Sequence, residues 1–224
     1  MLPQDEDGRE PFADRAEAGA ALALLLTAYR DRPDVLVLAL PRGGVPVAAP
    51  VSAALHAPLD VVIVRKLGLP RQPELAMGAL AGVGGHVELV LHEPVLRAAR
   101  VRPAEFVAVH DTELAELQRR ERAYRQGRPA LAVEGRTVLV VDDGAATGST
   151  VRAAVAALRQ HDPARVVVAL PVCPTDTRRA LERVADQVVC AREPAFFDGV
   201  GQEYRDFRAP SDDEVRALLR AAAP

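Results

Sequence analysis

Continuous apolar runs recur along the chain and are separated by stretches with helical spacing. The runs are rich in β-branched residues, which is typical of parallel strands buried on both faces. They lie at 35–40, 60–64, 138–141 and 165–170, with a shorter run at 187–190. The stretches between them predict helices over 45–56, 151–158 and 175–184, the last with Thr175 or Asp176 near its N-cap. This alternation predicts an α/β fold with a doubly wound, mostly parallel sheet.

The two ends of the chain add further elements. The first ten residues are polar and predict a loosely ordered segment. From Phe12 to Tyr29, apolar positions fit one or two amphipathic helix faces, on which Arg15 is expected to be a solvated charge. Residues 211–222 predict a helix capped by Ser211 or Asp212.

The middle of the chain interrupts the alternation. Residues 67–85 are rich in proline and glycine and predict an irregular segment, followed by a strand over 86–91. A long, highly charged helix is expected over 103–125, with Pro103 at its first position. We therefore expect 67–128 to be an insertion within a single domain that spans 1–224.

Composition and charge narrow the classes of function. A chain of 224 residues suits one α/β domain with a substantial core. The net charge of −3 argues against non-specific nucleic-acid binding, which needs a basic surface. No apolar run approaches the ~20 residues of a membrane span, so a cytoplasmic protein without a membrane partner is expected. Cys173 and Cys190 lack C-x-x-C spacing and are expected to be small buried residues, not a disulfide or zinc site.

One stretch joins a buried strand to a helix through two acids and a small-residue loop. Asp142 and Asp143 end the strand, where open α/β sheets bind ligands. The loop that follows is Gly144, Ala145, Ala146, Thr147, Gly148, Ser149 and Thr150. Small residues at a helix N-terminus expose N–H groups to an anion, and carboxylates accept hydrogen bonds from vicinal hydroxyls. The pattern therefore predicts a sugar-phosphate site. It is not a Walker loop, because no lysine follows the glycine.

Two further features can contribute to an anion site. Gly43 and Gly44 follow the first strand, where a double glycine can adopt backbone angles closed to other residues and expose amides; the alternative is an ordinary strand-to-helix turn. Arg65 and Lys66 end the strand at 60–64, and Lys66 is the only lysine in the sequence. A lysine ammonium can follow a departing anion. The alternative is a pair of solvated charges.

The stretch 138–150 resembles the phosphoribosyl pyrophosphate (PRPP) signature of type I phosphoribosyltransferases. That signature has four apolar residues, two acids and a small loop rich in threonine and glycine. The sequence matches it at Asp142, Asp143, Thr147, Gly148 and Thr150, and departs from it at Gly144, where an aliphatic residue is usual. The whole chain is similar to a bacterial group of predicted phosphoribosyltransferases whose acceptor is not settled.

The resemblance implies a type I phosphoribosyltransferase fold with a mobile-loop and helix insertion at 67–128. It implies that pyrophosphate is bound by Arg42, Gly43, Gly44, Arg65 and Lys66. It also assigns Lys66, Asp142 and Asp143 to catalysis, with the 5′-phosphate in the loop 144–150. Mg²⁺ would be held mainly by PRPP, with help from Asp142 and Asp143, and the family allows for a homodimer.

The segment 194–210, called the hood below, is expected to select the acceptor. It concentrates aromatic residues in a chain that has few, and aromatic faces can stack on a flat base. A loose likeness to the 6-oxopurine branch of the family implies that Phe196, Phe197, Val200 and Asp206 bind the base. The alternative is that these residues pack in the core.

We therefore expect an enzyme of nucleotide metabolism that transfers a phosphoribosyl group from PRPP to a nitrogenous base or related small acceptor. A PRPP- or nucleotide-sensing regulator on the same fold is the first alternative, although the charge balance and Lys66 favour the enzyme. An unrelated nucleotide-binding module is the second, and it would make the acid pair incidental.

Overall fold

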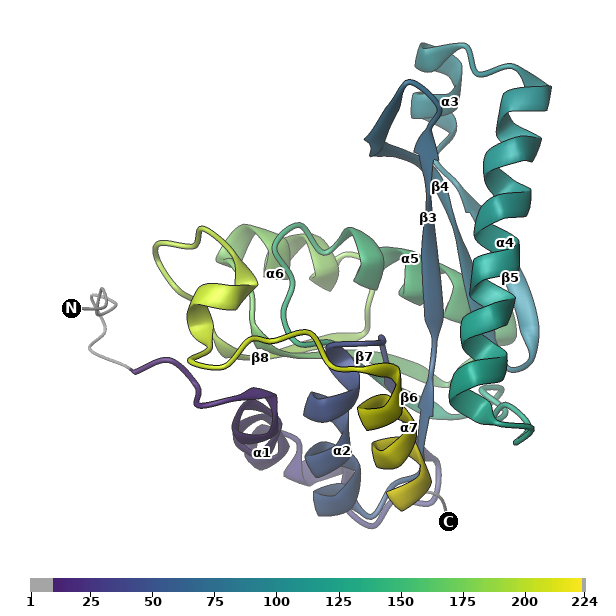
Figure 1. The fold of residues 1–224 in the computed structure, drawn as a ribbon. Coiled ribbons are helices and arrows are strands. Elements are labelled where there is room, and N and C mark those ends of the chain that lie inside the picture. Colours follow the sequence, from purple (N-terminus) through teal and green to yellow (C-terminus); the bar gives the residue numbers. More distant parts are fainter. Residues whose placement is uncertain (1–9, 223–224) are drawn as a thin grey trace.

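Five parallel strands form the central sheet of this computed structural model, in the order β2-β1-β6-β7-β8 (Figure 1). The strands are β1 Val35–Ala39, β2 Leu59–Val61, β6 Thr137–Val141, β7 Arg165–Val172 and β8 Gln187–Arg192. The structure describes residues 10–222, so most of the segment predicted to be loose lies outside the described residues. The predicted α/β fold with a mostly parallel sheet is confirmed.

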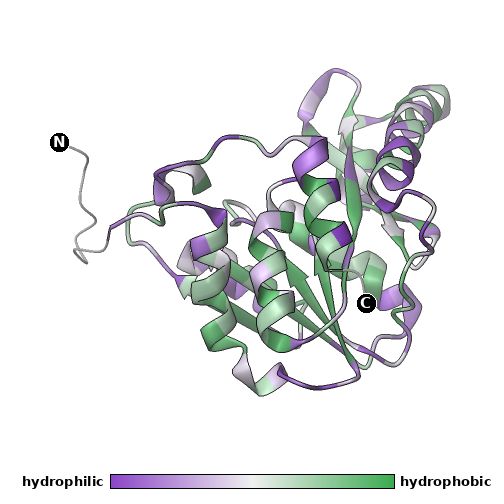
Figure 2. Ribbon diagram, turned by 60° about the horizontal axis from the view of Figure 1, so that its bottom comes forward, coloured by the Kyte–Doolittle hydropathy of each residue, from purple (hydrophilic) through white to green (hydrophobic). Residues whose placement is uncertain are grey.

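Successive residues of the central strands pack into opposite cores. In β1, Val35, Val37 and Ala39 face one core, whereas Leu36 and Leu38 face the other. The first face is covered by α1 Arg15–Leu25, α2 Gly44–Leu55 and α7 Asp212–Ala221, and the second by α5 Ser149–Leu158 and α6 Thr175–Glu182 (Figure 1). The strands between the helices are coloured as hydrophobic in Figure 2. A strand covered on both faces needs apolar residues at every position, which is why continuous runs predicted these strands.

The helix termini agree with the predicted caps in one case and differ in another. Ser211 caps α7, with its hydroxyl accepting a hydrogen bond from the N–H of Glu214 at 3.2 Å. In α6, Thr175 and Asp176 lie next to the N-cap as predicted, but the cap residue itself is Pro174 and no side chain caps the helix. The ring of Pro174 sets its φ to −61°, which leads an extended chain into the helix. The N-terminal helical region divides into α1 and a 3-10 turn at Thr27–Tyr29.

Residues 63–125 form an arm that rises from the core (Figure 1). Its strands β3 Ile63–Leu69, β4 Gln72–Val83 and β5 His86–Leu91 make an antiparallel sheet in the order β3-β4-β5. Two helices follow, α3 Glu93–Ala99 and α4 Pro103–Arg125. The long helix α4 packs against β3 and β4, and α5 contacts the arm sheet from the core side.

The prediction of an irregular segment at 67–85 is wrong, because β4 alone covers twelve residues of it. Its glycines lie where neighbouring atoms leave no room for a side chain. A Cβ on Gly78 would lie 2.7 Å from the carbonyl oxygen of Val90, and one on Gly82 would lie 2.3 Å from Glu121 Oε1. Glycine here marks close packing in a sheet, not a loop. The run at 60–64 also divides between β2 in the core and β3 in the arm.

Two expectations from composition concern the cysteines and membranes. Cys173 is buried and Cys190 is partly buried, and both are free thiols whose Sγ atoms lie 3.2 Å apart. They therefore occupy neighbouring positions at the ends of β7 and β8, a proximity that their sequence spacing does not reveal. Within residues 10–222, no helix has the length and apolar character needed to cross a membrane.

A buried ion pair between Arg125 and Asp60 joins α4 to the core sheet. Arg125, 8% exposed, places Nε 3.3 Å from Asp60 Oδ1 and Nη1 3.1 Å from Glu121 Oε1. Its Nη2 also donates to the carbonyl of Val61 at 3.0 Å. The second oxygen of Asp60 accepts the N–H of Leu131. One guanidinium thus serves two carboxylates at the junction between arm and core.

Arg125→Met is expected to destabilise the protein strongly, because it leaves Asp60 and Glu121 without their shared cation. Removing one partner of a buried ion pair costs about 3 kcal/mol or more, which corresponds to a fall of roughly 6–12 °C in Tm for a chain of this size. Thermal unfolding measures the effect. The control is Arg97→Met, which breaks an exposed pair with Glu93 on α3 and should cost under about 0.5 kcal/mol. Equal losses in the two variants would contradict the role given to Arg125.

Candidate functional site

The predicted site residues gather at the carboxyl ends of β1 and β6, which are neighbours in the sheet. The N–H of Leu40 donates to the carbonyl of Val141 at 2.9 Å, so the two strands end at the same level. The loop after β1 (residues 40–43) therefore lies beside the loop after β6 (residues 142–148). In open parallel sheets this edge is where ligands bind.

The two glycines after β1 are required by contact and not by backbone angle. Gly43 has φ −61°, an ordinary helical value, so the expectation of special backbone angles is wrong. A Cβ on Gly43 would lie 2.0 Å from Asp143 Oδ2, and one on Gly44 would lie 2.6 Å from the carbonyl oxygen of Val141. The N–H of Gly44 donates to Leu40 at 3.0 Å and is thus used within the turn. The peptide between Pro41 and Arg42 is cis.

A cavity of about 200 Å³ opens between the loop after β6 and the arm. Its lining consists of Lys66, Asp142, Gly144, Ala145, Ala146, Thr147, Gly148, Ser149, Thr150 and Val151. The helix α5 begins at its wall, with Gly148 as the N-cap residue in the left-handed conformation (φ 65°). Unsatisfied N–H groups and the helix dipole favour an anion at such an end. The structure thus brings every residue of the predicted phosphate loop together with Lys66.

Hydrogen bonds from β7 and α6 hold the loop in shape. The N–H of Ala145 donates to the carbonyl of Val172 at 3.1 Å. The hydroxyl of Thr177 donates to the carbonyl of Ala146 at 2.5 Å. These bonds direct the loop from outside the cavity, while Thr147, Ser149 and Thr150 line the cavity itself.

The departure from the PRPP signature at Gly144 has a packing explanation. Gly144 has φ 155°, where side chains are rarely found. A Cβ there would lie 2.6 Å from Val200 Cγ1 and 2.8 Å from Val172 Cγ1. Val200 of the hood fills the space that an aliphatic side chain at position 144 would occupy, so this loop position must be glycine.

The two acids occupy different surroundings. Asp142 lines the cavity, and its Oδ1 accepts the backbone N–H of Asp143 at 2.9 Å. Asp143 Oδ2 instead accepts a hydrogen bond from Arg15 Nε at 2.8 Å. Burial and the neighbouring charge of Asp143 raise the pKa of Asp142 well above its ordinary value. Burial also raises the pKa of Asp143, although Arg15 opposes the rise.

Arg15 is therefore a site residue that the sequence interpretation missed. It was expected to be solvated, but it is 7% exposed. It shares the inward face of α1 with Ala18, Gly19 and Leu22. That spacing of three, four and seven residues is the signal that could have identified it, because a residue on the same stripe as the core contacts must also point inward.

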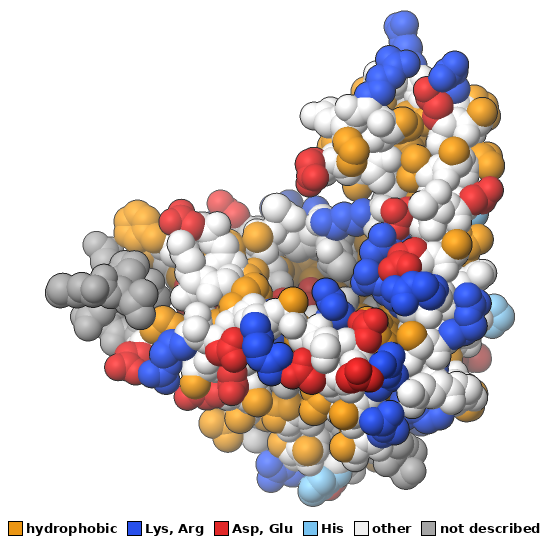
Figure 3. Space-filling view, in the orientation of Figure 1, with side chains coloured by type: hydrophobic (Ala, Val, Ile, Leu, Met, Phe, Trp, Pro, Cys, Tyr) orange, Lys and Arg blue, Asp and Glu red, His pale blue; other side chains and the backbone are white. Residues whose placement is uncertain are grey.

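The strand β3 separates the two basic residues predicted to bind pyrophosphate. Successive strand residues point to opposite faces. Lys66 lines the cavity, whereas Arg65 lies 2.6 Å from Glu113 on α4. Only Lys66 of this pair therefore reaches the phosphate loop. Arg42 is exposed on the loop after β1. Basic side chains gather where the arm meets the core (Figure 3).

The structure divides the four residues predicted to bind the base. Phe197 and Val200 pack in a small apolar cluster around Tyr204, as the core-packing alternative expects. Phe196 is 74% exposed, which leaves its ring free of the core. Asp206 lies apart from that cluster, on the rim of a second pocket. The sequence order of the hood did not reveal this division.

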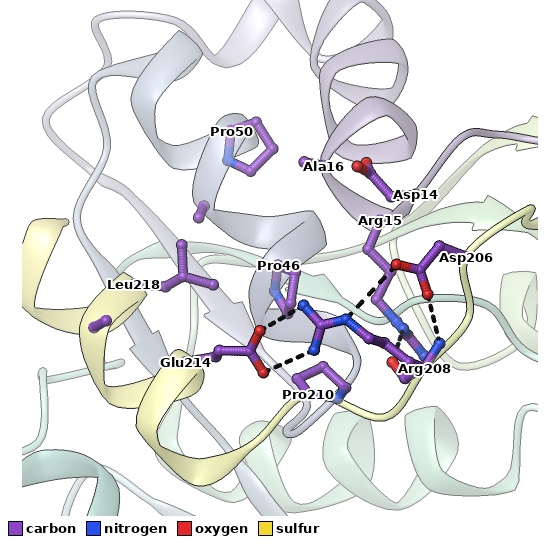
Figure 4. Close-up of a pocket in the computed structure, with 12 residues that line it drawn as sticks. Asp14, Arg15, Ala16, Pro46, Pro50, Asp206, Arg208, Pro210, Glu214 and Leu218 are labelled. Atoms are coloured by element: carbon purple, nitrogen blue, oxygen red, sulfur yellow. Dashed lines mark hydrogen bonds and ion pairs between the residues drawn. The ribbon is translucent and has the colours of Figure 1, made fainter.

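That second pocket, about 450 Å³, lies among α1, α2, α7 and the end of the hood (Figure 4). Its apolar wall includes Pro46, Pro50 and Leu218. The charged groups at its rim pair with one another, since Arg208 lies 2.6 Å from Glu214 and 3.6 Å from Asp206. It contains no residue of the phosphate loop, so we assign the functional site to the smaller cavity.

The acid pair suits a metal ion that arrives with its ligand. Within residues 10–222, no three His, Cys, Asp or Glu side chains are grouped so that they could hold a metal. One oxygen of each acid already has a protein partner, and few oxygens remain for a cation. Mg²⁺ fits such a site, because it commonly takes one or two carboxylates together with phosphate oxygens and waters.

Asp142→Asn is expected to stabilise the fold at neutral and alkaline pH. The unfolded carboxyl ionises near its ordinary pKa, whereas the folded one keeps its proton to higher pH, so stability falls as pH rises between the two values. An amide avoids this cost and still accepts the N–H of Asp143. We expect a gain of about 1 kcal/mol, roughly 2–4 °C in Tm, that shrinks as the pH falls toward about 4.

Thermal unfolding across this pH range measures the gain. Asp111→Asn is the control, because Asp111 is exposed on α4 and its change should stay within about 0.5 kcal/mol. If Asp142→Asn had a lower Tm than the parent protein at alkaline pH, the electrostatic account would be wrong.

Comparisons with known proteins indicate the family to which the chain belongs. The family model described as "Phosphoribosyl transferase domain" matches residues 14–205. Two relatives in Mycobacterium tuberculosis, "Putative phosphoribosyl transferase Rv0571c" (strain ATCC 25618 / H37Rv) and "Putative phosphoribosyl transferase MT0597" (strain CDC 1551 / Oshkosh), are each 47% identical over 211 residues. The match covers 94% of this chain and 47% of each relative, so the chain spans about half the length of the curated relatives it matches.

A solved structure adds agreement at the level of the fold. The crystal structure of TT1426 from Thermus thermophilus has a TM-score of 0.82 and 40% sequence identity, covering 96% of this chain and 100% of that one. The family match extends over both loops, Lys66 and the acid pair. The resemblance found in the sequence is thereby confirmed: the chain belongs to the phosphoribosyl transferase family.

Proposed function

We propose that this protein transfers the 5-phosphoribosyl group of PRPP to a nitrogen of a base or a related small acceptor and releases pyrophosphate. One observation carries the proposal: Lys66 from the arm and Asp142 from the end of β6 line the same cavity as the loop 144–151. A cation, a carboxylate and an amide-rich helix N-terminus in one cavity suit a ligand with phosphate and hydroxyl groups.

Each wall of the cavity has a role in this proposal. The loop and the first turn of α5 bind the 5′-phosphate. Asp142 accepts hydrogen bonds from the ribose hydroxyls, and Asp143 supports it from behind. Lys66 is the mobile cation that offsets negative charge on the phosphates. The turn at Gly43, which contacts Asp143, and the exposed Arg42 before it are the groups we assign to the leaving pyrophosphate.

The reaction breaks the bond between the anomeric carbon and the pyrophosphate oxygen, and the electron pair leaves with pyrophosphate. A bond then forms from the acceptor nitrogen to the anomeric carbon, and the proton which that nitrogen loses passes to solvent water. The carboxylates near the ribose stabilise the positive charge that develops on the sugar, and Lys66 stabilises the charge on the leaving group. Bound Mg²⁺ would supply further neutralisation of the pyrophosphate oxygens.

The proposal is tested by incubating the protein with PRPP, Mg²⁺ and a panel of purine and pyrimidine bases, and by following pyrophosphate release. Turnover that depends on a base supports the transferase. PRPP binding without turnover across the panel would favour the alternative, a PRPP-sensing regulator. The Asp142→Asn/Asp143→Asn double variant should remain folded and lose PRPP binding, since both acids of the ribose site are neutralised. Unchanged binding by this variant would overturn the ribose assignment.

Gly43→Ala is expected to weaken PRPP binding about tenfold or more. The new methyl group would overlap Asp143 Oδ2, so Asp143 must move. Because the backbone N–H of Asp143 bonds the carboxylate of Asp142, that movement also disturbs Asp142. Isothermal titration with PRPP and Mg²⁺ measures the change. Gly199→Ala is the control, because no atom lies within 4 Å of a Cβ at that position. If Gly43→Ala bound PRPP as tightly as the parent, the placement of Asp143 would not matter to the site.

A further inference from the structure

Asp143 is held from several directions, although it does not line the cavity itself. Its Oδ2 accepts Arg15 Nε at 2.8 Å, and its backbone carbonyl accepts the hydroxyl of Tyr204 at 2.5 Å. Its backbone N–H donates to Asp142 Oδ1 at 2.9 Å. A shift of Asp143 would therefore also move the carboxylate of Asp142, which is the acid that lines the cavity.

Arg15 is itself fixed by the hood. Its Nη1 donates to the backbone carbonyl of Arg208 at 2.8 Å (Figure 4), and its Cζ lies 4.0 Å from the centre of the Phe207 ring. A planar guanidinium can make these contacts and bond Asp143 at the same time, because its donors form a rigid fork. A lysine in its place would keep the charge and lose the fork.

The segment just before α1 and the hood are joined by backbone hydrogen bonds, which help to set the position of Arg15 at the start of that helix. The N–H of Phe12 donates to the backbone carbonyl of Glu203 at 2.8 Å, and the N–H of Arg205 donates to the backbone carbonyl of Phe12 at 2.8 Å. The ring of Tyr204 packs 5.8 Å from that of Phe12 and 5.1 Å from that of Phe207. Arg15 is thus the side chain through which this joined unit bonds the carboxylate of Asp143.

We propose that Arg15 is a positioning residue for the acid pair, which acts through Asp143 to hold the Asp142 carboxylate toward a bound ribose. Arg15 also links the acid pair to the hood, because it bonds both Asp143 and the backbone carbonyl of Arg208. The same residue thus positions the acids of the ribose site and contacts the region expected to bind the acceptor. This inference rests on the proposed function in one respect, namely that the cavity takes a ribose phosphate.

The test compares two probes, ribose 5-phosphate and inorganic phosphate, by isothermal titration. Arg15→Lys is expected to bind ribose 5-phosphate about tenfold more weakly, and Arg15→Gln up to about a hundredfold. Arg15→Lys should bind inorganic phosphate within about twofold of the parent, because Arg15 does not line the cavity that holds phosphate and the charge is kept. A general loss of folding would weaken both probes alike.

A double-variant cycle shows whether Arg15 acts through Asp143. In an Asp143→Ala background, Arg15→Lys should cause no further loss for ribose 5-phosphate, because the carboxylate that accepts Arg15 Nε is already gone. The control is Arg208→Gln, whose side chain is exposed and pairs with Glu214, while its backbone carbonyl still accepts Arg15. This control should bind both probes like the parent.

The outcomes separate this inference from the transferase proposal. Independent, multiplying losses in the cycle, or an equal loss for both probes in Arg15→Lys, would overturn the positioning role. Failure of the parent protein to bind ribose 5-phosphate would overturn it as well. If the parent binds ribose 5-phosphate but releases no pyrophosphate from PRPP with any base, the transferase proposal fails. The Arg15 variants then still test the positioning role, because that test measures binding alone. Should Arg15→Gln not fold, Arg15→Lys and its combination with Asp143→Ala carry the test.

Discussion

The carboxylate of Asp143 occupies the space that a side chain on Gly43 would need, and this close contact fixes the two loops of the site against each other. A Cβ at Gly43 would be 2.0 Å from Asp143 Oδ2, which is far inside any normal contact. The loops can meet this closely because β1 and β6 are parallel neighbours that end at the same level. Glycine at this position is thus a consequence of the acid that lies opposite it, and the geometry of the cavity follows from their contact.

Two adjacent carboxylates in a buried position carry an electrostatic cost. Burial raises the pKa of both, and Asp143 raises that of Asp142 further. Arg15 offsets one of the two charges by pairing with Asp143, and leaves Asp142 facing the cavity. Functional sites often retain such unfavourable arrangements because a ligand needs the groups that stability alone would remove. Arg15 thus bonds Asp143, which does not line the cavity, and not Asp142, which does.

The cavity is shared between two sheets, and this explains the construction of the arm. The core contributes the acid pair and the phosphate loop, whereas β3 of the arm contributes Lys66. Strand alternation points Lys66 toward α5 and Arg65 toward Glu113 on α4. The buried Arg125 cluster anchors α4 to the core and so keeps the arm, with Lys66, at its place beside the loop.

The central sheet, and the strand, loop and helix that carry the acid pair, could be predicted from the order of residues, because each is a local pattern. Buried parallel strands need unbroken apolar runs, and a loop that cradles an anion needs small residues before a helix. The roles of Arg15, Gly43 and Gly144 emerge only in the folded chain, since each depends on an atom that is remote in sequence. The same holds for β4, whose glycines suggest a loop although Val90 and Glu121 lie against them. Local patterns record backbone geometry, whereas contacts between distant segments arise only when the chain folds.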